Sequence, residues 1–256
     1  MANNDSIQKT LIVAVSLCVV CSVLVSGAAV ALKDMQVANK LDDRNRNILA
    51  AAGLLEEGTP IAEQFSRIET RLVDLDTGEF VEGMDPESFD QRKSAKNPST
   101  SLVLSSEQDV AKVRRRSNYA LVYLVREQGE LEKVVLPLHG YGLWSTMYGF
   151  VALQSDLNTV AGLGFYEHGE TPGLGGEIDN PRWKASWPGK KIYQDQAVAL
   201  ELIKGSVDKT RAGSEYQVDG LAGATLTSRG VTNMVHFWMG QQGFGPFLEK
   251  LKAGDA

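Results

Sequence analysis

The stretch between Lys9 and Lys33 constrains this chain most, because it contains no charged side chain and consists mainly of Val, Leu, Ala and Ile. As a helix that rises about 1.5 Å per residue, residues 10–32 are long enough to cross a hydrocarbon core of about 30 Å. A cleaved signal peptide is the alternative, with Ala29-Val30-Ala31 as its cleavage site. The stretch exceeds the usual signal core of about 7–15 residues and has only one basic residue before it, so we favour an uncleaved transmembrane anchor.

Charge alone leaves the orientation of this anchor open. Only Lys9 precedes it, whereas Lys33, Lys40, Arg44 and Arg46 follow it. The positive-inside rule would keep the chain after the anchor in the cytoplasm, yet long domains translocate regardless of flanking charge.

The residues around the anchor divide into a short tail over 1–9 and a helical stalk with a peripheral α/β segment over 33–117. Apolar residues recur at helical spacing over 35–55, a second helical piece is expected over 61–68, and residues 71–76 alternate as a strand. Residues 85–101 are polar and contain two prolines, which predicts a surface excursion with little regular structure.

Residues 118–256 are predicted to form the main domain, of α+β class. Strands are expected over 119–125, 133–138, 149–153 and 160–166, and helices over 194–204 and 229–240. Strands joined by tight turns before late helices indicate a mainly antiparallel sheet with flanking helices. Neither a G-x-G-x-x-G after a strand nor a Walker lysine is present, which argues against a doubly wound nucleotide fold.

Charge and cysteine usage exclude several classes of protein. The net charge of -6 argues against a nucleic-acid partner, which needs a basic surface. Cys18 and Cys21 both lie within the apolar stretch, so we interpret them as small apolar side chains, not as a redox or metal pair. Without a second cysteine pair or a nearby histidine, no metal site is expected.

The stretch from Asp219 to Ser228 has the composition of an anion site. Two glycines precede a cluster of hydroxyls, and a predicted helix follows. Glycine lets the backbone approach a bound group, and the start of a helix offers free N–H groups and a positive dipole end. The alternative is an ordinary loop with a helix cap.

Two further loops could hold a flat ligand. The first, Gly140 to Ser145, combines two glycines with Trp144, which offers a stacking face; the alternative is a hairpin with a core Trp. The second, His168 to Glu177, is too rich in glycine to be held by side-chain packing alone. Within it Glu170 and Thr171 can hydrogen-bond a polar ring edge, and Leu174 could cover a ring face, whereas His168 is interpreted as a structural histidine.

Asp219-x-x-Ala222-Gly223-Ala224-Thr225 resembles the flavinylation motif D-x-x-[S/T]-G-A-T of covalent FMN-binding domains. The resemblance implies a phosphoester between FMN and the hydroxyl of Thr225. It departs at Ala222, where the family has Ser or Thr, and the pair Thr227-Ser228 could supply the missing hydroxyl. The G-x-G-L-W and E-T-P-G-L-G stretches also match this family. The implied FMN-binding residues are Gly142, Leu143, Trp144, Ser145, Glu170, Thr171, Gly173, Leu174, Gly175, Lys204, Gly223, Ala224, Thr225, Leu226, Thr227 and Ser228.

Two of these assignments have a physical basis as well. Lys204 is expected to end a helix before Gly205, where its ammonium could face the phosphodiester. The alternative is a lysine that only complements the negative end of the helix dipole. The hydroxyl of Thr225 is a poor nucleophile without an adjacent base. The family precedent is therefore a separate flavin transferase that uses FAD and magnesium.

The resemblance extends over the whole chain. The anchor, the W-x-x-M-Y-G-F stretch from Trp144 and the G-F-G-P-F-L tail from Gly243 are similar to the C subunits of Na+-translocating NADH:quinone reductases. This implies an electron-transfer subunit of a six-subunit bacterial inner-membrane complex that passes electrons from NADH to ubiquinone and exports Na+. The chain would have no catalytic activity alone, and its single-pass anchor would place the FMN domain, over 118–256, in the periplasm.

Three alternatives remain. One is the equivalent subunit of a ferredoxin:NAD+ oxidoreductase-type complex. The others lack the cofactor: a membrane-anchored binding module, or an assembly subunit that packs against its partners.

Overall fold

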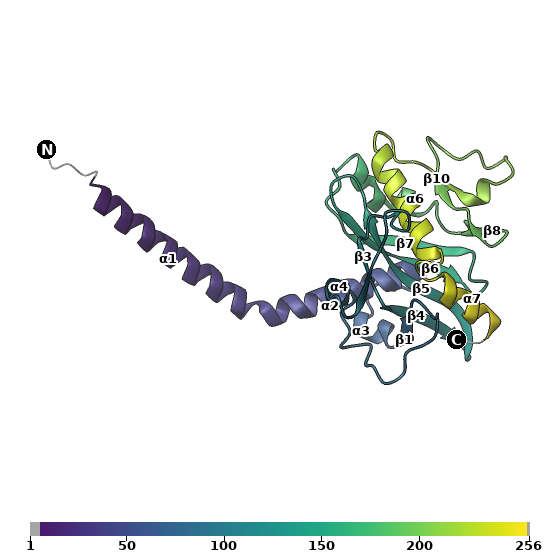
Figure 1. Ribbon diagram of the computed structural model, residues 1–256, viewed down its shortest axis with the longest axis horizontal. Helices are drawn as coiled ribbons and strands as arrows, with labels where there is room; N and C mark the ends of the chain where they lie inside the picture. The colour runs from purple at the N-terminus through teal and green to yellow at the C-terminus, as the bar shows by residue number, and fades with distance from the viewer. Residues whose placement is uncertain (1–5, 255–256) are drawn as a thin grey trace. The chain divides into compact units, whose positions relative to one another are not determined.

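The computed structural model describes residues 6–254 as two compact units, one ending at Asp43 and one beginning at Arg44 (Figure 1). Residues 1–5 of the predicted tail lie outside the described part. Helix α1 (Ile7–Ala31) begins after Ser6, whose hydroxyl accepts from the Lys9 amide at 3.3 Å. Helix α1 is long and apolar enough to cross a membrane, although a signal sequence near the N-terminus would meet the same criterion. Helix α2 (Lys33–Ala52) confirms the predicted stalk helix.

A five-stranded antiparallel sheet organises the unit that begins at Arg44. Its strands are β1 (Ile68–Asp74), β4 (Tyr119–Glu127), β5 (Glu130–Tyr141), β6 (Thr146–Gln154) and β7 (Val160–Glu167), in the order β1-β4-β5-β6-β7. The sheet confirms the predicted α+β class. Its strands β4 to β7 are longer than expected, because residues beyond the apolar runs, such as Arg126 and Glu130, also pair across the sheet.

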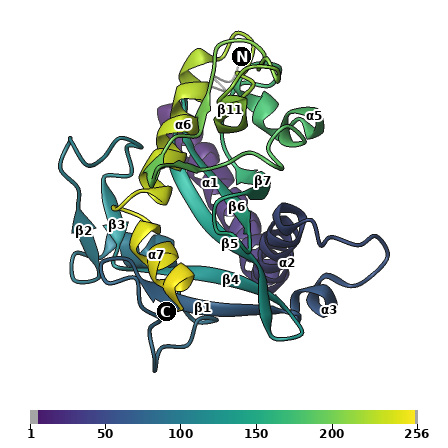
Figure 2. The ribbon, with the colours of Figure 1, turned by 90° about the vertical axis from the view of Figure 1, so that its right-hand side faces the viewer.

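Both faces of this sheet are covered, which explains the nearly continuous apolar runs in its strands. On one face Val122 and Leu136 pack beneath α6 (Thr225–Met239) and α7 (Gly245–Ala253), which cross the sheet in Figure 2. On the other, Tyr123 and Phe150 pack against Ile48 of the last turns of α2.

The remaining elements are short. They are α3 (Ile61–Phe65), α4 (Gln91–Lys96), β2 (Ser101–Val103), β3 (Arg115–Ser117), η1 (Gly175–Asp179), α5 (Pro181–Lys184), β8 (Tyr193–Gln194), β9 (Ala197–Val198), β10 (Glu201–Leu202), η2 (Ser214–Tyr216) and β11 (Gln217–Val218).

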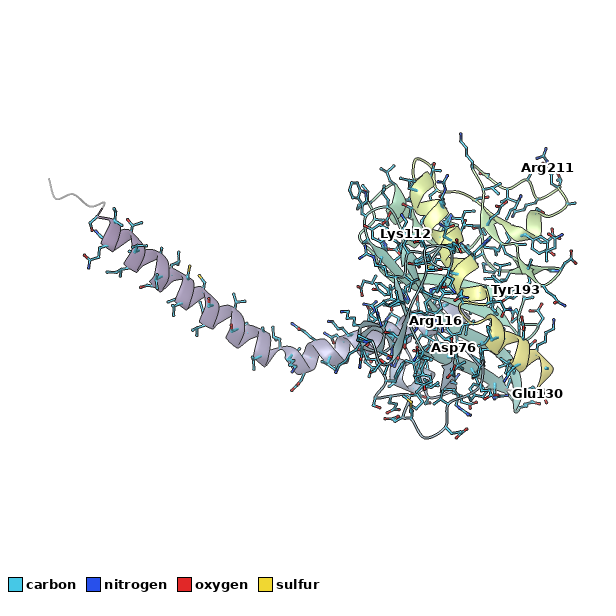
Figure 3. All side chains as sticks on the ribbon, in the orientation of Figure 1. Asp76, Lys112, Arg116, Glu130, Tyr193 and Arg211 are labelled. Atoms are coloured by element: carbon cyan, nitrogen blue, oxygen red, sulfur yellow. The ribbon has the colours of Figure 1, made fainter. Side chains whose placement is uncertain are left out.

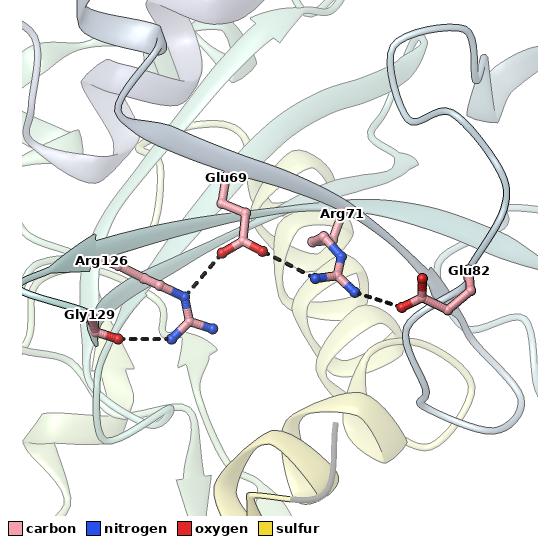
Figure 4. A network of polar contacts seen from close by, with 5 residues as sticks. All are labelled: Glu69, Arg71, Glu82, Arg126 and Gly129. Atoms are coloured by element: carbon pink, nitrogen blue, oxygen red, sulfur yellow. Dashed lines mark hydrogen bonds and ion pairs between the residues drawn. The ribbon is translucent and has the colours of Figure 1, made fainter.

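A network of charged side chains holds the edge strand β1 to its neighbour (Figure 4). Glu69 accepts from Arg71 at 3.2 Å and from Arg126 at 3.0 Å, and Arg71 also bonds Glu82 at 3.3 Å. Burial acts to raise the pKa of the Glu69 carboxyl, but its bonds to the two arginines outweigh burial and lower the pKa. Because these side chains are partly exposed, the network adds little stability by itself.

The predicted helix over 194–204 is wrong. The segment forms the hairpin β8–β9 and then β10, which pairs in parallel with β11. Asp195 and Gln196 both adopt positive φ, 48° and 68°, which turns the chain back on itself. Farther on, the amide of Leu202 donates to the Thr232 hydroxyl at 2.9 Å, and that of Ile203 to the Val218 carbonyl at 3.0 Å, so tertiary partners replace helical bonds.

The polar excursion over 85–101 contains more structure than predicted. Asp90 accepts from the Lys93 amide at 3.0 Å and begins α4. Arg92 on this helix lies 3.5 Å from the centre of the Tyr148 ring and bonds Glu167 at 2.8 Å. These contacts fix the excursion against β6 and β7.

Candidate functional site

Three chain segments meet around the carboxylate of Glu170. It accepts from the amides of Leu143 at 3.1 Å, Trp144 at 3.0 Å and Ser145 at 3.4 Å, all in the β5–β6 connection. It also accepts from the hydroxyl of Thr227 on α6 at 2.6 Å. The structure therefore brings together the two Gly-rich loops and the hydroxyl cluster that the sequence indicated.

The carboxylate of Glu170 is committed to these protein donors. The side chain is buried, which acts to raise its pKa, but the bonds from Thr227 and from the three amides outweigh burial and hold the pKa below its usual value. The expectation was that Glu170 would bond a polar ring edge. Its geometry instead makes it an ionised anchor that fixes the loops on either side.

Glycine is required where these loops pass closest to that anchor. A Cβ on Gly142 would lie 2.5 Å from Oε1 of Glu170, and a Cβ on Gly175 would lie 2.6 Å from the Thr227 hydroxyl. Gly223 adopts a φ of +71°, which L-residues rarely take. Steric exclusion therefore explains the glycines better than loop mobility does.

Helix α6 begins at Thr225, four residues before the predicted start at Arg229. Its first helical bond runs from the Ser228 amide to the Ala224 carbonyl at 3.0 Å, and no side chain caps it. Within residues 6–254, the amides of Thr225, Leu226 and Thr227 have no acceptor. They are free to bind an anion, which the positive end of the helix dipole also favours.

Only one of the three hydroxyls at this helix start faces outward. Thr227 is fully buried against Glu170, and the Ser228 hydroxyl accepts from the Leu221 amide at 3.0 Å while it donates to the Ala224 carbonyl at 3.1 Å. Thr225, by contrast, is exposed. The fold thus distinguishes Thr225 from its neighbours as the accessible hydroxyl.

Four exposed apolar side chains lie on the three segments that meet at Glu170. Their exposed fractions are 39% for Leu143, 64% for Trp144, 44% for Leu174 and 52% for Leu226. The Leu174 side chain lies against the turn before α6, since a Cβ added to Gly223 would be only 3.0 Å from it. An apolar surface beside unpaired amides suits a flat aromatic group with an anionic tail.

The segment before α6 is fixed by Asp219 and Gly220. The Asp219 carboxylate accepts from the Val207 amide at 2.7 Å, and its carbonyl accepts from the Trp183 indole at 2.8 Å. Gly220 leaves no room for a side chain, because its Cβ would lie 2.1 Å from the Ile203 carbonyl oxygen. Asp219, the first residue of the segment that resembles a flavinylation motif, therefore shapes the turn.

Three of the predicted FMN-binding residues, Thr171, Gly173 and Lys204, are exposed to solvent. Thr171 and Gly173 are exposed on the outer part of their loop. Lys204 is also exposed, and it follows β10, so the expectation that it ends a helix is wrong. It lies in the segment that pairs with Gly220, whose amide donates to the Gly205 carbonyl at 2.9 Å.

Sequence reasoning missed the pair formed by His168 and Asp179. Nδ1 of His168 accepts from the Glu170 amide at 3.2 Å, so the ring proton lies on Nε2, which bonds Asp179 at 2.7 Å. The Gly169 amide donates to the Ser145 hydroxyl at 2.6 Å. His168 thus orients the backbone that presents Glu170, a role that no local motif signals.

Comparison with known proteins gives consistent matches. Residues 142–240 match the FMN-binding domain family. The chain is 54% identical over 261 residues to the C subunit of the Na(+)-translocating NADH-quinone reductase of Pseudomonas aeruginosa, covering 100% of both chains. It is 51% identical over 256 residues to the protein of the same name from Vibrio alginolyticus, covering 99% of this chain and 98% of the relative.

Solved structures agree. The crystal structure of Shewanella oneidensis NqrC aligns with a TM-score of 0.78 and 40% identity over 84% of this chain and 99% of that one. The corresponding protein from Parabacteroides distasonis aligns with a TM-score of 0.65 and 28% identity over 85% of this chain and 96% of that one.

Proposed function

Because this chain belongs to the C subunits of Na+-translocating NADH-quinone reductases, we propose that it carries FMN as a phosphoester of Thr225 and transfers electrons within that complex. As a subunit of this complex it is not an enzyme by itself. The observation that carries the covalent assignment is the exposed hydroxyl of Thr225 beside three unpaired amides at the start of α6.

The residues present fit a phosphodiester at this position. A phosphodiester keeps one negative charge at neutral pH, which the free amides of Thr225, Leu226 and Thr227 and the α6 dipole stabilise. Lys204 is a candidate for additional charge pairing from the neighbouring segment.

The exposed apolar side chains fit the ring of the flavin. Leu143, Trp144, Leu174 and Leu226 would contact the ring system and exclude water from it. When bound, FMN supplies one-electron chemistry, which none of the side chains here provides. Glu170 keeps both glycine-rich loops in place for this contact.

Attachment requires a second protein. The carboxylate of Glu170 is bonded to Thr227 and to loop amides, so it is not free to serve Thr225 as a base. A flavin transferase would form the ester from FAD, with the Thr225 oxygen bonded to the FMN phosphate and AMP as the leaving group. Thr225 is then a substrate first and a cofactor anchor afterwards.

The same proposal places the chain in a bacterial inner membrane. Helix α1 would be a single-pass anchor, the FMN domain would lie in the periplasm, and the partners would be the other subunits of a six-subunit complex. A covalent bond is physically sensible there, because a flavin lost outside the cytoplasm could not be replaced. Identity over the full length with NADH-quinone reductase subunits supports this assignment over the ferredoxin:NAD+ oxidoreductase-type complex.

The covalent bond is tested on the full chain co-expressed with a flavin transferase. After denaturing electrophoresis, the wild-type band should fluoresce under ultraviolet light, Thr225→Val should be dark, and Thr225→Ser should keep some fluorescence. A dark wild-type band would exclude covalent FMN and favour a binding or assembly module without cofactor. A C-terminal reporter that is active only outside the cytoplasm tests the orientation, and a silent reporter would refute the periplasmic placement.

A further inference from the structure

A cavity of about 620 Å³ lies at the end of α6 opposite to Thr225. Its walls come from the β6–β7 turn, the β8–β9 hairpin, the last residues of α6 and α7. Tyr193, labelled in Figure 3, lines it. Because α6 has 15 residues and is therefore about 22 Å long, this cavity is separate from the proposed flavin site.

The cavity is preformed. Asn158 accepts from the Tyr193 amide at 2.7 Å and donates to the Tyr193 carbonyl at 3.3 Å, so it fixes the hairpin to the β6–β7 turn. The Tyr193 hydroxyl donates to the Met239 carbonyl at 2.7 Å, which fixes the hairpin to the end of α6. A site with rigid walls binds a partner at a lower entropic cost than a mobile surface.

Backbone strain is concentrated around the cavity. Six non-glycine residues within 6–254 have positive φ, and three of them, Leu157 at 56°, Asp195 at 48° and Gln196 at 68°, line it. A two-residue hairpin of this kind favours Asn-Gly, which would relieve the strain. The chain instead keeps two longer side chains, Asp195 and Gln196, at the tip of β8–β9. Strain that is retained in this way indicates that the side chains themselves have a function.

The lining of the cavity is part apolar and part charged, and its charged residues form what we call the rim. Leu157, Val198, Met239 and Leu248 supply apolar surface. The rim contains three carboxylates, those of Asp156, Asp195 and Glu249, and one ammonium, that of Lys252.

The three carboxylates do not form a metal site. Asp156 is already bonded to the Asn158 and Thr159 amides and to the Thr159 hydroxyl. No group of three His, Cys, Asp or Glu side chains in the described part of the chain could hold a metal ion. The complement of this lining is a side chain with an apolar stem and a positively charged end.

We propose that this cavity is a docking site for a lysine or arginine side chain of another subunit of the complex. The aliphatic stem of that side chain lies on Leu157, Met239 and Leu248, and its charged end lies between Asp195 and Glu249. The proposal rests on membership of a multi-subunit complex and on the charge of the rim, and it is independent of covalent FMN attachment.

Charge reversal in the assembled complex tests the proposal. Asp195→Lys with Glu249→Lys is compared with the matched control Glu87→Lys with Glu107→Lys, in which two exposed glutamates elsewhere undergo the same charge change. The complex is purified through an affinity tag on a different subunit over a series of NaCl concentrations, and this chain is quantified by immunoblot. We expect roughly tenfold weaker retention for the rim variant and wild-type retention for the control.

The flavin band separates this outcome from the proposed function. Ultraviolet fluorescence of the rim variant should equal that of the wild type, because Thr225 lies at the other end of α6. Retention of the rim variant equal to that of the wild type at every salt concentration would overturn the docking site.

Cross-linking identifies the occupant. A photoreactive residue in place of Gln196, irradiated in the purified complex, should link to a peptide of another subunit that contains lysine or arginine. A link to a second copy of this chain, or the absence of any link from an intact complex, would contradict the proposal.

Discussion

The buried hydroxyl of Thr227 donates to the carboxylate of Glu170 at 2.6 Å, and the two residues are 57 positions apart in the sequence. Through this bond the start of α6 and the two glycine-rich loops become one rigid unit, since Glu170 also accepts from the backbone of the β5–β6 connection. The proposed flavin site therefore depends on a carboxylate that is bonded to the protein itself.

Replacement of Glu170 by Gln should destabilise the fold and loosen the site. An amide at this position turns an N–H group toward donors, so at least one buried donor loses its acceptor, which costs about 1–3 kcal/mol. Urea unfolding measures this loss, and the ultraviolet gel should show weaker flavinylation. Glu177→Gln is the control, because the Glu177 carboxylate accepts from the nearby Asn180 side chain at 2.7 Å and joins no distant segments. Equal unfolding free energies for the two variants would argue against Glu170 as the anchor.

Acid should weaken the same junction. Burial acts to raise the pKa of the Glu170 carboxyl, but the bonds from Thr227 and the loop amides outweigh burial, so the pKa is lowered. A group with a lowered folded-state pKa adds stability above its ordinary value, about 4.3, and loses that contribution as the pH falls through the lowered value. The wild type should thus lose more unfolding free energy than Glu170→Gln between about pH 7 and about pH 3. Because Glu69 and Asp156 are unchanged in both proteins, parallel acid profiles would show that Glu170 is not responsible.

Gly142→Ala should disrupt the loop through steric overlap alone. The added Cβ would lie 2.5 Å from Oε1 of Glu170, so the loop or the carboxylate must move, at a cost of about 1–3 kcal/mol. Gly164→Ala is a matched control in β7, where a Cβ meets no atom within 4 Å. Thermal unfolding measures both variants. A Gly142→Ala protein as stable as the control would mean that the loop relaxes freely.

Much of the fold was predictable, because the deciding interactions are local. The absence of charge over 10–32 indicates α1, and the apolar runs indicate β4 to β7, since a strand buried on both faces needs apolar residues throughout. The glycines before α6 and the hydroxyls in its first turn likewise indicate a candidate site for an anion.

The errors arise where distant partners or unusual residues decide the structure. The β8–β9 hairpin turns at Asp195-Gln196, which lacks the Asn-Gly signal of such turns. Helix α6 starts without a capping side chain, so its first turn was assigned to the preceding loop. The role of Glu170 depends on donors 25 to 57 positions away, which no motif within its loop encodes.

Trp144→Ala should leave the fold and the phosphoester intact and change the flavin. The side chain is 64% exposed, so the unfolding free energy should change by no more than about 0.5 kcal/mol. A stacked Trp alters flavin emission, so the native variant should fluoresce differently from the wild type while the denatured bands match. Trp144→Phe, which keeps an aromatic face, should resemble the wild type. Identical native spectra for all three proteins would assign Trp144 to some other contact.

Gln196→Gly should stabilise the protein and thereby reveal the strain at the cavity rim. Gln196 has a φ of 68°, and the left-handed region costs a non-glycine residue roughly 1–2 kcal/mol. Glycine removes this cost but gains entropy in the unfolded chain, so a net gain of roughly 0.5–1 kcal/mol in unfolding free energy is expected. Gln194→Gly, in strand β8, is the control and should destabilise, because glycine there gains freedom without relieving strain. Urea unfolding of both variants measures the difference. If Gln196→Gly proved less stable than the wild type, the Gln196 side chain would stabilise the hairpin itself, and its retention would need no explanation from a partner.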